Sequence, residues 1–305
     1  MSAAIRLATN EPAHNDNPRA PGMSAVRRPA LRYHGGKFML ASWIISNMPT
    51  HRTYVEPFAG ACSVLLRKTR TYAEVANDLN LKIYDYFKVL RDPSSYAHLK
   101  RALQFTPFHE REFRLSLEDC DDPIEQARRL CVRSFLSHGS DGVTSSTVPG
   151  FRSSISRAGS TPATDWSNLP GHMDAIHERL QRVTWLTMDA MEVIEKYRTS
   201  DTLLYVDPPY HPSTRHDKIS VGDTYRAYGH ELDADGHEKL LVALRETPAM
   251  VMLSGYRCEI YDDMLSDWVR LDTRAQSDGN AKKTESLWLN PAAADNRPSP
   301  SLFGA

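Results

Sequence analysis

The stretch LLYVDPPY, residues 203–210, decides the fold. Its four β-type residues stop abruptly at an acid, two prolines and an aromatic ring. Proline fixes φ and cannot donate to a sheet ladder, so we expect a strand that ends here and a rigid loop formed by Asp207, Pro208, Pro209 and Tyr210. Open α/β sheets bind their ligands at this carboxyl edge. The stretch therefore predicts a ligand site at the end of a central strand.

Other strands along the chain also end in acidic residues. Residues 52–66 predict a strand, a tight turn and a helix, and the strand at 73–76 runs into Asp78. A strand at 183–187 ends before Asp189. Strands that alternate with helices predict an α/β fold with a mainly parallel sheet. Alternating patterns at 268–273 and 285–289 predict a terminal antiparallel hairpin.

The first turn suits a cationic ligand. It does not match the GxGxxG dinucleotide fingerprint, and it carries an acid where a pyrophosphate site would avoid one. Glu56 beside a helix N-terminus suits a cationic amino-acid head group. Asp78 is placed to accept from both hydroxyls of a ribose, and Asp189 from the amino group of an adenine. Asp189 also fits a helix cap, and both roles are compatible. The turn itself contributes Phe58, Ala59 and Gly60 to this expected ligand site.

The segment Tyr33-His34-Gly35-Gly36-Lys37 is a candidate part of the same site. Gly36 allows the backbone to approach a ligand closely, and Lys37 can offset a carboxylate or a phosphate. An ordinary glycine turn is the alternative interpretation of this segment.

Helices are expected where apolar residues recur at helical spacing. The helix from Leu81 is capped by Asn80 and is expected to bury Ile83, Tyr84 and Phe87. The other expected helices span residues 38–48, 123–138, 174–182 and 235–245.

Residues 91–182 change character and are interpreted as an inserted lobe. Residues 139–170 show little periodicity, and a loop of that length is usually functional or disordered. Five arginines and one acid lie between residues 127 and 160. Such a local positive charge favours DNA contact, with solvated arginines on a loop as the alternative. The basic residues that we expect to contact DNA are Arg128, Arg133, Arg152 and Arg157 in the lobe, and Lys282 and Lys283 in the hairpin loop.

Composition sets the outer limits. The chain has 305 residues, 41% hydrophobic content and a net charge of −1, so any nucleic-acid surface must arise from local clustering. The four cysteines have no metal-ligand spacing, which favours reduced cytoplasmic thiols and no metal. No apolar run approaches the ~20 residues of a membrane span. The expected organisation is a disordered leader at 1–28, a catalytic domain at 29–90 and 183–291, the lobe at 91–182, and a disordered tail at 292–305.

The order of these motifs resembles that of the Dam-like adenine-specific DNA methyltransferases. Asp-Pro-Pro-Tyr at 207–210 is similar to their catalytic signature, and residues 253–256 with 284–291 are most similar to the phage and prophage branch. The resemblance covers about residues 31–291, while the lobe shows no segment that aligns with better-known members. It implies the Rossmann-like S-adenosylmethionine-dependent methyltransferase fold, with residues 91–182 as a target-recognition insert.

The resemblance also implies a mechanism. S-adenosylmethionine is the expected methyl donor, and Asp207 with the Pro208 carbonyl is expected to orient the N6 amine of an adenine flipped out of duplex DNA onto Tyr210. No metal is required. A cognate restriction endonuclease, and a monomeric or weakly dimeric state, are further expectations. The alternatives are methylation of RNA adenine or protein glutamine, and a DNA-binding protein without activity.

Overall fold

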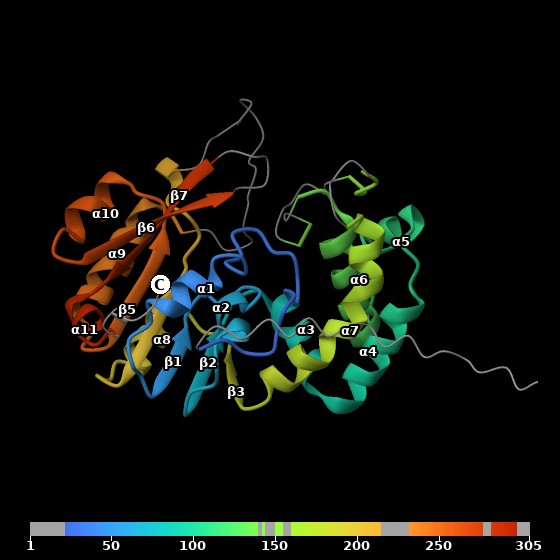
Figure 1. Cartoon of the computed structure of the whole chain (residues 1–305), viewed down its shortest axis with the longest axis horizontal. Helices are drawn as coiled ribbons and strands as arrows, with labels where there is room; N and C mark the ends of the chain where they lie inside the picture. Colours follow the sequence, from blue (N-terminus) through green and yellow to red (C-terminus); the bar gives the residue numbers. More distant parts are fainter. Residues whose placement is uncertain are drawn as a thin grey trace, which may run out of the picture.

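A seven-stranded sheet organises the molecule (Figure 1). The computed structural model describes residues 22–139, 142–143, 150–154, 160–214, 232–276 and 282–297. The strand order is β3-β2-β1-β4-β5-β7-β6. Strands β1 to β5 are parallel to one another, and β7 runs antiparallel to both β5 and β6. The expected mainly parallel sheet with a terminal antiparallel hairpin is therefore confirmed. The strands are β1 Thr53–Glu56, β2 Ala73–Asn77, β3 Val183–Leu186, β4 Thr202–Val206, β5 Met250–Gly255, β6 Val269–Gln276 and β7 Lys282–Leu289.

Both faces of the sheet are covered, which explains why its central strands are continuously apolar. In β4, Leu203 and Tyr205 pack into the core on one face, while Leu204 and Val206 pack into the core on the other. The first core also receives α1, α2, α3 and the helices of the lobe, and the second receives α8, α9 and α10. With both faces buried, β4 holds its terminal loop in a rigid setting.

Several helices begin with a capping side chain that accepts a backbone N–H, followed by proline at the first helical position. Asp92, Asp122, Thr161 and Asn290 cap α4, α6, α7 and α11 in this way. The helices are α1 Ala41–Ser46, α2 Ser63–Arg67, α3 Leu81–Arg91, α4 Pro93–Phe105, α5 Glu110–Leu115, α6 Pro123–Leu136, α7 Pro162–Leu180, α8 Ala190–Lys196, α9 Ala234–Glu246, α10 Glu259–Met264 and α11 Pro291–Asp295, with a 3₁₀ turn at Pro212–Thr214. In the part of the chain that the structure describes, no helix has both the length and the apolarity to cross a bilayer.

Helices α4 to α7 form the lobe and stand together on one side of the sheet (Figure 1). The expected start of the last helix at residue 174 is wrong, because α7 begins at Pro162. The sequence hides this start behind Pro170 and Gly171, which usually interrupt helices. Pro170 is tolerated inside a helix whose buried face carries Trp166, Leu169 and Met173.

Other expectations about the ends of elements are also corrected. The helix expected at 38–48 is confined to Ala41–Ser46. In α3 the buried tyrosine is Tyr86, whose hydroxyl donates to the Ala30 carbonyl at 2.8 Å, whereas Tyr84 is half-exposed. Lys282 and Lys283 belong to β7 and not to a loop.

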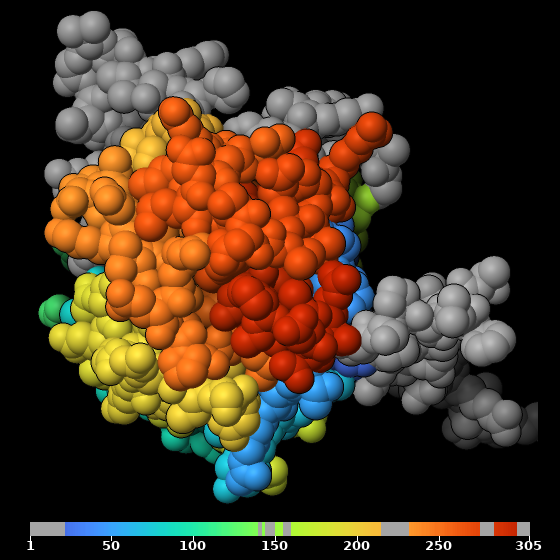
Figure 2. Space-filling model, turned by 90° about the vertical axis from the view of Figure 1, so that its left-hand side faces the viewer, coloured from blue at the N-terminus to red at the C-terminus, as the bar shows by residue number. Residues whose placement is uncertain are grey.

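The expected disorder at both ends is wrong for the residues nearest the fold. Near the N-terminus, Met23 is buried and forms a β-bridge with Lys68. Near the C-terminus, α11 packs on β5 and buries Ala293. The Thr50 amide donates to the Asn296 carbonyl at 3.3 Å. Figure 2 shows the red C-terminal residues beside the blue segment around residue 50. Residues 1–21 and 298–305 lie outside the described ranges.

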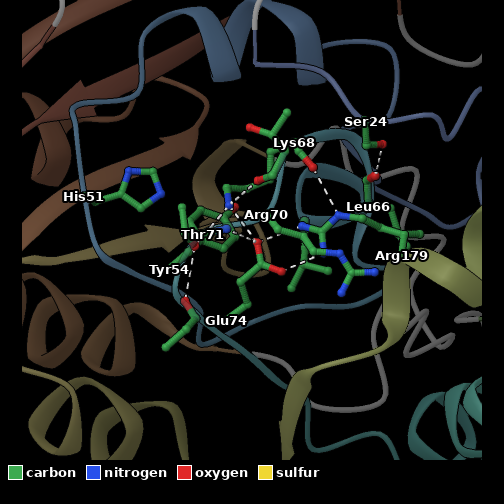
Figure 3. A network of polar contacts seen from close by, with 12 residues as sticks. Ser24, His51, Tyr54, Leu66, Lys68, Arg70, Thr71, Glu74 and Arg179 are labelled. Carbon is green, nitrogen blue, oxygen red and sulfur yellow. Dashed lines mark hydrogen bonds and ion pairs between the residues drawn. The ribbon is translucent and has the colours of Figure 1, made fainter.

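A buried ionic network joins the lobe to the start of β2 (Figure 3). Arg179 of α7 donates to both carboxylate oxygens of Glu74, at 2.6 and 2.8 Å, and Lys68 donates to the same carboxylate at 2.7 Å. All three side chains are at most 5% exposed. Burial lowers the pKa of Lys68 to about 8, even though Glu74 opposes this shift. The network fixes how α7 lies against the sheet.

Candidate active site

The carboxyl ends of four parallel strands surround one cavity. Strands β3, β2, β1 and β4 are consecutive in the sheet, and the chain changes direction of winding between β1 and β4. Such a switch point is where open α/β sheets bind ligands. The cavity has a volume of about 440 Å³. It is lined by all ten residues that the sequence suggested for cofactor binding, namely Tyr33, Gly36, Lys37, Glu56, Phe58, Ala59, Gly60, Asp78, Asp189 and Asp207.

The turn after β1 is held in place by the acid after β2. Asp78 accepts from the Gly60 amide at 2.7 Å through one oxygen and from the Asn80 amide at 2.8 Å through the other. Gly60 has a φ of +47°, and a Cβ there would lie 3.0 Å from the ring of Tyr33. Glycine is therefore required both by the left-handed backbone and by the close approach of Tyr33.

Glu56 is the most deeply buried acid of the cavity wall, at 2% exposure. One of its oxygens accepts from the Tyr54 hydroxyl and from the Leu65 amide of α2, both at 2.8 Å. Burial raises its pKa to about 8, despite these two hydrogen bonds, which favour the ionised form. A buried carboxyl that is costly to ionise favours a cationic ligand group, because the ligand charge would compensate it.

Asn77 ends β2 and holds the loop that follows β3. The sequence analysis did not select it. Its amide donates to the carbonyls of Pro57 and Met188, at 2.9 and 3.0 Å, and its carbonyl accepts from the Met188 amide. Asp189 accepts from the Met191 amide at 2.8 Å and caps α8, while it also lines the cavity. Asn77 thus sets the spacing between the β1 turn and the Asp189 loop.

Asp207 carries two protein donors on one oxygen. Its Oδ1 accepts from the Ser254 hydroxyl at 2.8 Å and lies 2.7 Å from Lys37 Nζ. Asp207 also lines the cavity, and among the described residues no donor contacts its Oδ2, so this oxygen keeps its acceptor capacity. Ser254 in turn lies 3.0 Å from the Tyr205 hydroxyl. The strand-end acid is therefore oriented by groups from β4, β5 and the Gly-Gly-Lys segment.

Lys37 is almost fully buried, at 4% exposure, among polar groups. Besides Asp207, its ammonium contacts the Gly35 carbonyl at 2.8 Å, the Tyr210 hydroxyl at 3.0 Å and Glu285 at 3.4 Å. Burial lowers the pKa of an ammonium, yet the surrounding acids raise the pKa of Lys37 well above its usual value. Lys37 therefore remains charged and acts first as the counter-ion of Asp207.

Tyr210 presents its ring beside this cluster. It stacks on Tyr256 with ring centroids 4.4 Å apart and planes inclined by 21°, and its hydroxyl lies 3.4 Å from Glu285. The sequence analysis missed Ser254 and Glu285. No local pattern in the sequence distinguishes Glu285 from an ordinary outward-facing acid of an alternating strand.

The arginines expected to contact DNA occupy different environments. Arg128 is buried, and its guanidinium lies 2.7 Å from Glu125 and 2.8 Å from Glu112, which argues for a structural role. Arg133 is half-buried in α6, and burial lowers its pKa. Arg152 has its guanidinium 4.0 Å from Asp165. Arg157 and the side chains of Lys282 and Lys283 lie outside the described residues.

The cavity residues fit S-adenosylmethionine by their chemistry. The cavity wall combines the buried Glu56, which suits an ammonium, with Asp78 at the next strand end, which suits ribose hydroxyls. The turn at Gly60 allows a ligand to approach closely. The cavity volume lies within the range usual for small-molecule sites, about 300–1,000 Å³. Within the described ranges, no group of three or more His, Cys, Asp or Glu side chains could hold a metal ion.

Comparison with known proteins gives a consistent result. A family model described as D12 class N6 adenine-specific DNA methyltransferase matches residues 33–277. A DNA adenine methylase from Vibrio cholerae serotype O1 is 27% identical over 192 residues, which cover 61% of this chain and 66% of that protein, just under two thirds. The type II methyltransferase M.MjaIII from Methanocaldococcus jannaschii is 24% identical over 224 residues, covering 66% of this chain and 74% of that protein.

Proposed function

Since the chain belongs to the D12 class N6 adenine-specific DNA methyltransferase family, we propose that it methylates N6 of adenine in duplex DNA with S-adenosylmethionine as donor. The observation that carries this proposal is the setting of Asp207. Its Oδ1 is fixed by Lys37 and Ser254, which leaves Oδ2 at the cavity to accept from an amine. An acceptor held in advance at the reacting group needs no reorganisation in the transition state.

The proposed cofactor roles follow the cavity wall. Glu56 binds the amino-acid ammonium, Asp78 the ribose hydroxyls and Asp189 the adenine amine, while Tyr33, Gly36, Phe58, Ala59 and Gly60 shape the space between them. When bound, S-adenosylmethionine supplies an activated methyl group from its sulfonium. The protein contributes binding and orientation, which are effective because they fix the reacting atoms close together.

The target amine needs help because its lone pair is delocalised into the purine ring. Asp207 and the Pro208 carbonyl accept its two hydrogens and so favour a geometry in which the lone pair is available. Pro208 and Pro209 keep this loop rigid. Adenine N6 is hidden in the base pair, so the base must leave the stack at a cost of a few kcal/mol. Stacking on the Tyr210 ring returns about 1 to 3 kcal/mol.

We further propose that the lobe contacts the DNA backbone through Arg133, Arg152 and Arg157, with Lys282 and Lys283 on the hairpin as additional contacts. Arg128 is left out of this set because Glu125 and Glu112 already neutralise it. A monomer or weak dimer, and a cognate restriction endonuclease, stay predictions. Sedimentation, and restriction challenge of cells that carry the gene, would test them.

The decisive experiment is transfer of tritiated methyl groups to duplex DNA, RNA and protein in parallel. We expect label in DNA, recovered as N6-methyladenine after digestion, and much slower labelling by Asp207→Ala. Label in RNA or protein with none in DNA would overturn the proposal. Methylation-sensitive long-read sequencing of DNA from expressing cells would then give the recognition sequence.

A further inference from the structure

A buried carboxylate at the edge of the site has no part in the function proposed above. Glu285 lies on β7, is 2% exposed and is not among the residues that line the cofactor cavity. A buried acid is costly unless it is paired and hydrogen-bonded. Its side-chain partners in the described structure are Lys37 and Tyr210, which both belong to the proposed catalytic site. These contacts point to a role in that site and not in general stability.

Glu285 touches the two groups that control the target base. Its Oε1 lies 3.4 Å from Lys37 Nζ, and its carboxylate accepts from the Tyr210 hydroxyl at 3.4 Å. Lys37 is the counter-ion of Asp207, and Tyr210 provides the stacking ring. A single side chain on β7 therefore reaches both the amine acceptor, through Lys37, and the aromatic platform.

The charges of the cluster explain what this contact achieves. Two carboxylates, Asp207 and Glu285, share one ammonium. Because Lys37 is divided between them, Asp207 keeps more negative charge than it would in an isolated pair, and it remains a strong acceptor for an amine that becomes positive. The second carboxylate also opposes loss of the Lys37 proton. The other titratable groups that influence Lys37 are the hydroxyls of Tyr205 and Tyr210.

We propose that Glu285 is a positioning residue for methyl transfer, which holds Lys37 charged between two carboxylates and fixes the orientation of the Tyr210 ring. This inference rests on the proposed function. It predicts that Glu285 affects the chemical step and not cofactor affinity.

The test compares Glu285→Gln, Glu285→Asp and Ser286→Ala with the parent protein. Ser286 is the next residue of β7, is fully buried and donates to Asp272 at 2.8 Å, so its variant perturbs the same strand outside the cluster. We expect Glu285→Gln to slow single-turnover methyl transfer to plasmid DNA by about 10- to 100-fold, the effect of losing a hydrogen bond to a charged group. The dissociation constant for S-adenosylmethionine should not change. Ser286→Ala should match the parent.

A second readout is independent of activity. The Lys37 side chain, labelled with ¹³C and assigned by its loss in Lys37→Met, is titrated by NMR. Removing one neighbouring carboxylate lowers the pKa of an ammonium, so Lys37 of Glu285→Gln should begin to lose its proton at lower pH than Lys37 of the parent, within the alkaline range in which both proteins stay folded. Glu285→Asp keeps the charge and should restore the titration.

The outcomes distinguish failure of the inference about Glu285 from failure of the proposed function. If the parent methylates DNA and Glu285→Gln keeps either the parent rate or the parent Lys37 titration, the inference is overturned. An equal loss of rate in Ser286→Ala would also overturn it, since the effect would then belong to the strand. If the parent methylates no DNA, the proposed function fails, and the Lys37 titration alone decides whether Glu285 holds the ammonium.

Discussion

Lys37 Nζ lies 2.7 Å from Asp207 Oδ1, although the two residues are far apart in the sequence. Lys37 belongs to the segment before α1, and Asp207 follows β4. Their contact joins the Gly-Gly-Lys segment to the proline loop, and among the described residues it leaves the second oxygen of Asp207 without a donor. The charge of this pair and its orientation are therefore set by the fold before any substrate is present.

Substitution of Asp207 should separate acceptor geometry from charge. Asparagine keeps one acceptor oxygen, so Asp207→Asn should retain detectable transfer, whereas Asp207→Ala should lose about 3 kcal/mol or more of transition-state stabilisation. Cofactor binding should persist in both. Single-turnover methyl transfer measures the difference, and an alanine variant as active as the parent would remove Asp207 from the catalytic role.

Asp78 should contribute to cofactor binding both directly and through the β1 turn that it anchors. Asp78→Ala loses the acceptors for the Gly60 and Asn80 amides, and we expect affinity for S-adenosylmethionine to fall by about 1 to 3 kcal/mol. Calorimetry checks this. Asp92→Ala is a matched control, because Asp92 accepts the Ser95 amide at 2.7 Å outside the cavity. Unchanged affinity in Asp78→Ala would exclude Asp78 from the site.

Cofactor affinity should depend on pH through Glu56. Without ligand its pKa is raised to about 8, so the carboxyl is mostly protonated at neutral pH. A bound ammonium favours the ionised form and lowers this pKa, so binding should release a proton. Affinity should therefore rise with pH up to about 8 and fall above it, because the α-ammonium of the ligand, with a usual pKa of about 7.7 to 8, then loses its proton.

The measurement is calorimetry in two buffers that differ in ionisation enthalpy, between about pH 6.5 and about pH 8.5. Glu56→Gln has no carboxyl to ionise and should bind weakly at every pH. A parent affinity that stays flat across this range would contradict the assignment of Glu56 to the ammonium.

The arginines of the lobe should divide into two classes. Replacing Arg152 and Arg157 together should weaken DNA binding for all sequences and reduce the salt slope by roughly two. Arg128→Ala should instead lower the free energy of unfolding by about 1 to 3 kcal/mol, because it removes the partner of Glu112 and leaves Glu125 with Arg129 alone. Filter binding at several salt concentrations and thermal unfolding distinguish the classes. An unchanged slope in the double variant would assign those residues to a solvated loop.

Arg179 should be important for stability. Arg179→Ala leaves the buried carboxylate of Glu74 with Lys68 alone, and we expect a loss of about 3 to 5 kcal/mol. Arg198→Ala is the control, because its pair with Glu195 is largely exposed and should contribute less than about 1 kcal/mol. Equal unfolding midpoints for the two variants would contradict this ranking.

The strand-end acids could be predicted from the sequence because parallel strands share one carboxyl edge. Glu56, Asp78, Asp189 and Asp207 each follow a short apolar run, so local pattern was enough to bring them together. Contacts made by distant pairing could not be predicted. Glu285 reaches the site only because β7 lies between β5 and β6, and no local pattern specifies that order.

The count of charged residues was also insufficient to predict which arginines of residues 91–182 are available to contact DNA. A count of arginines does not reveal which of them have carboxylate partners, and Arg128 finds Glu112 across a turn between two helices. The early start of α7 was hidden for a different reason. Proline and glycine weaken a helix locally, but the burial of Trp166 and Leu169 outweighs that preference.

The ionic network of Arg179, Glu74 and Lys68 has a consequence for exchanging residues 91–182 between relatives. Arg179 lies in α7, whereas Glu74 lies in β2 and Lys68 directly follows α2. A graft that replaces all of residues 91–182 with a lobe lacking an arginine at this place would bury an acid without its main partner. A graft whose second junction lies before Thr161 leaves α7 with the host, so that the recipient keeps its own anchor and only the preceding helices and loops are exchanged.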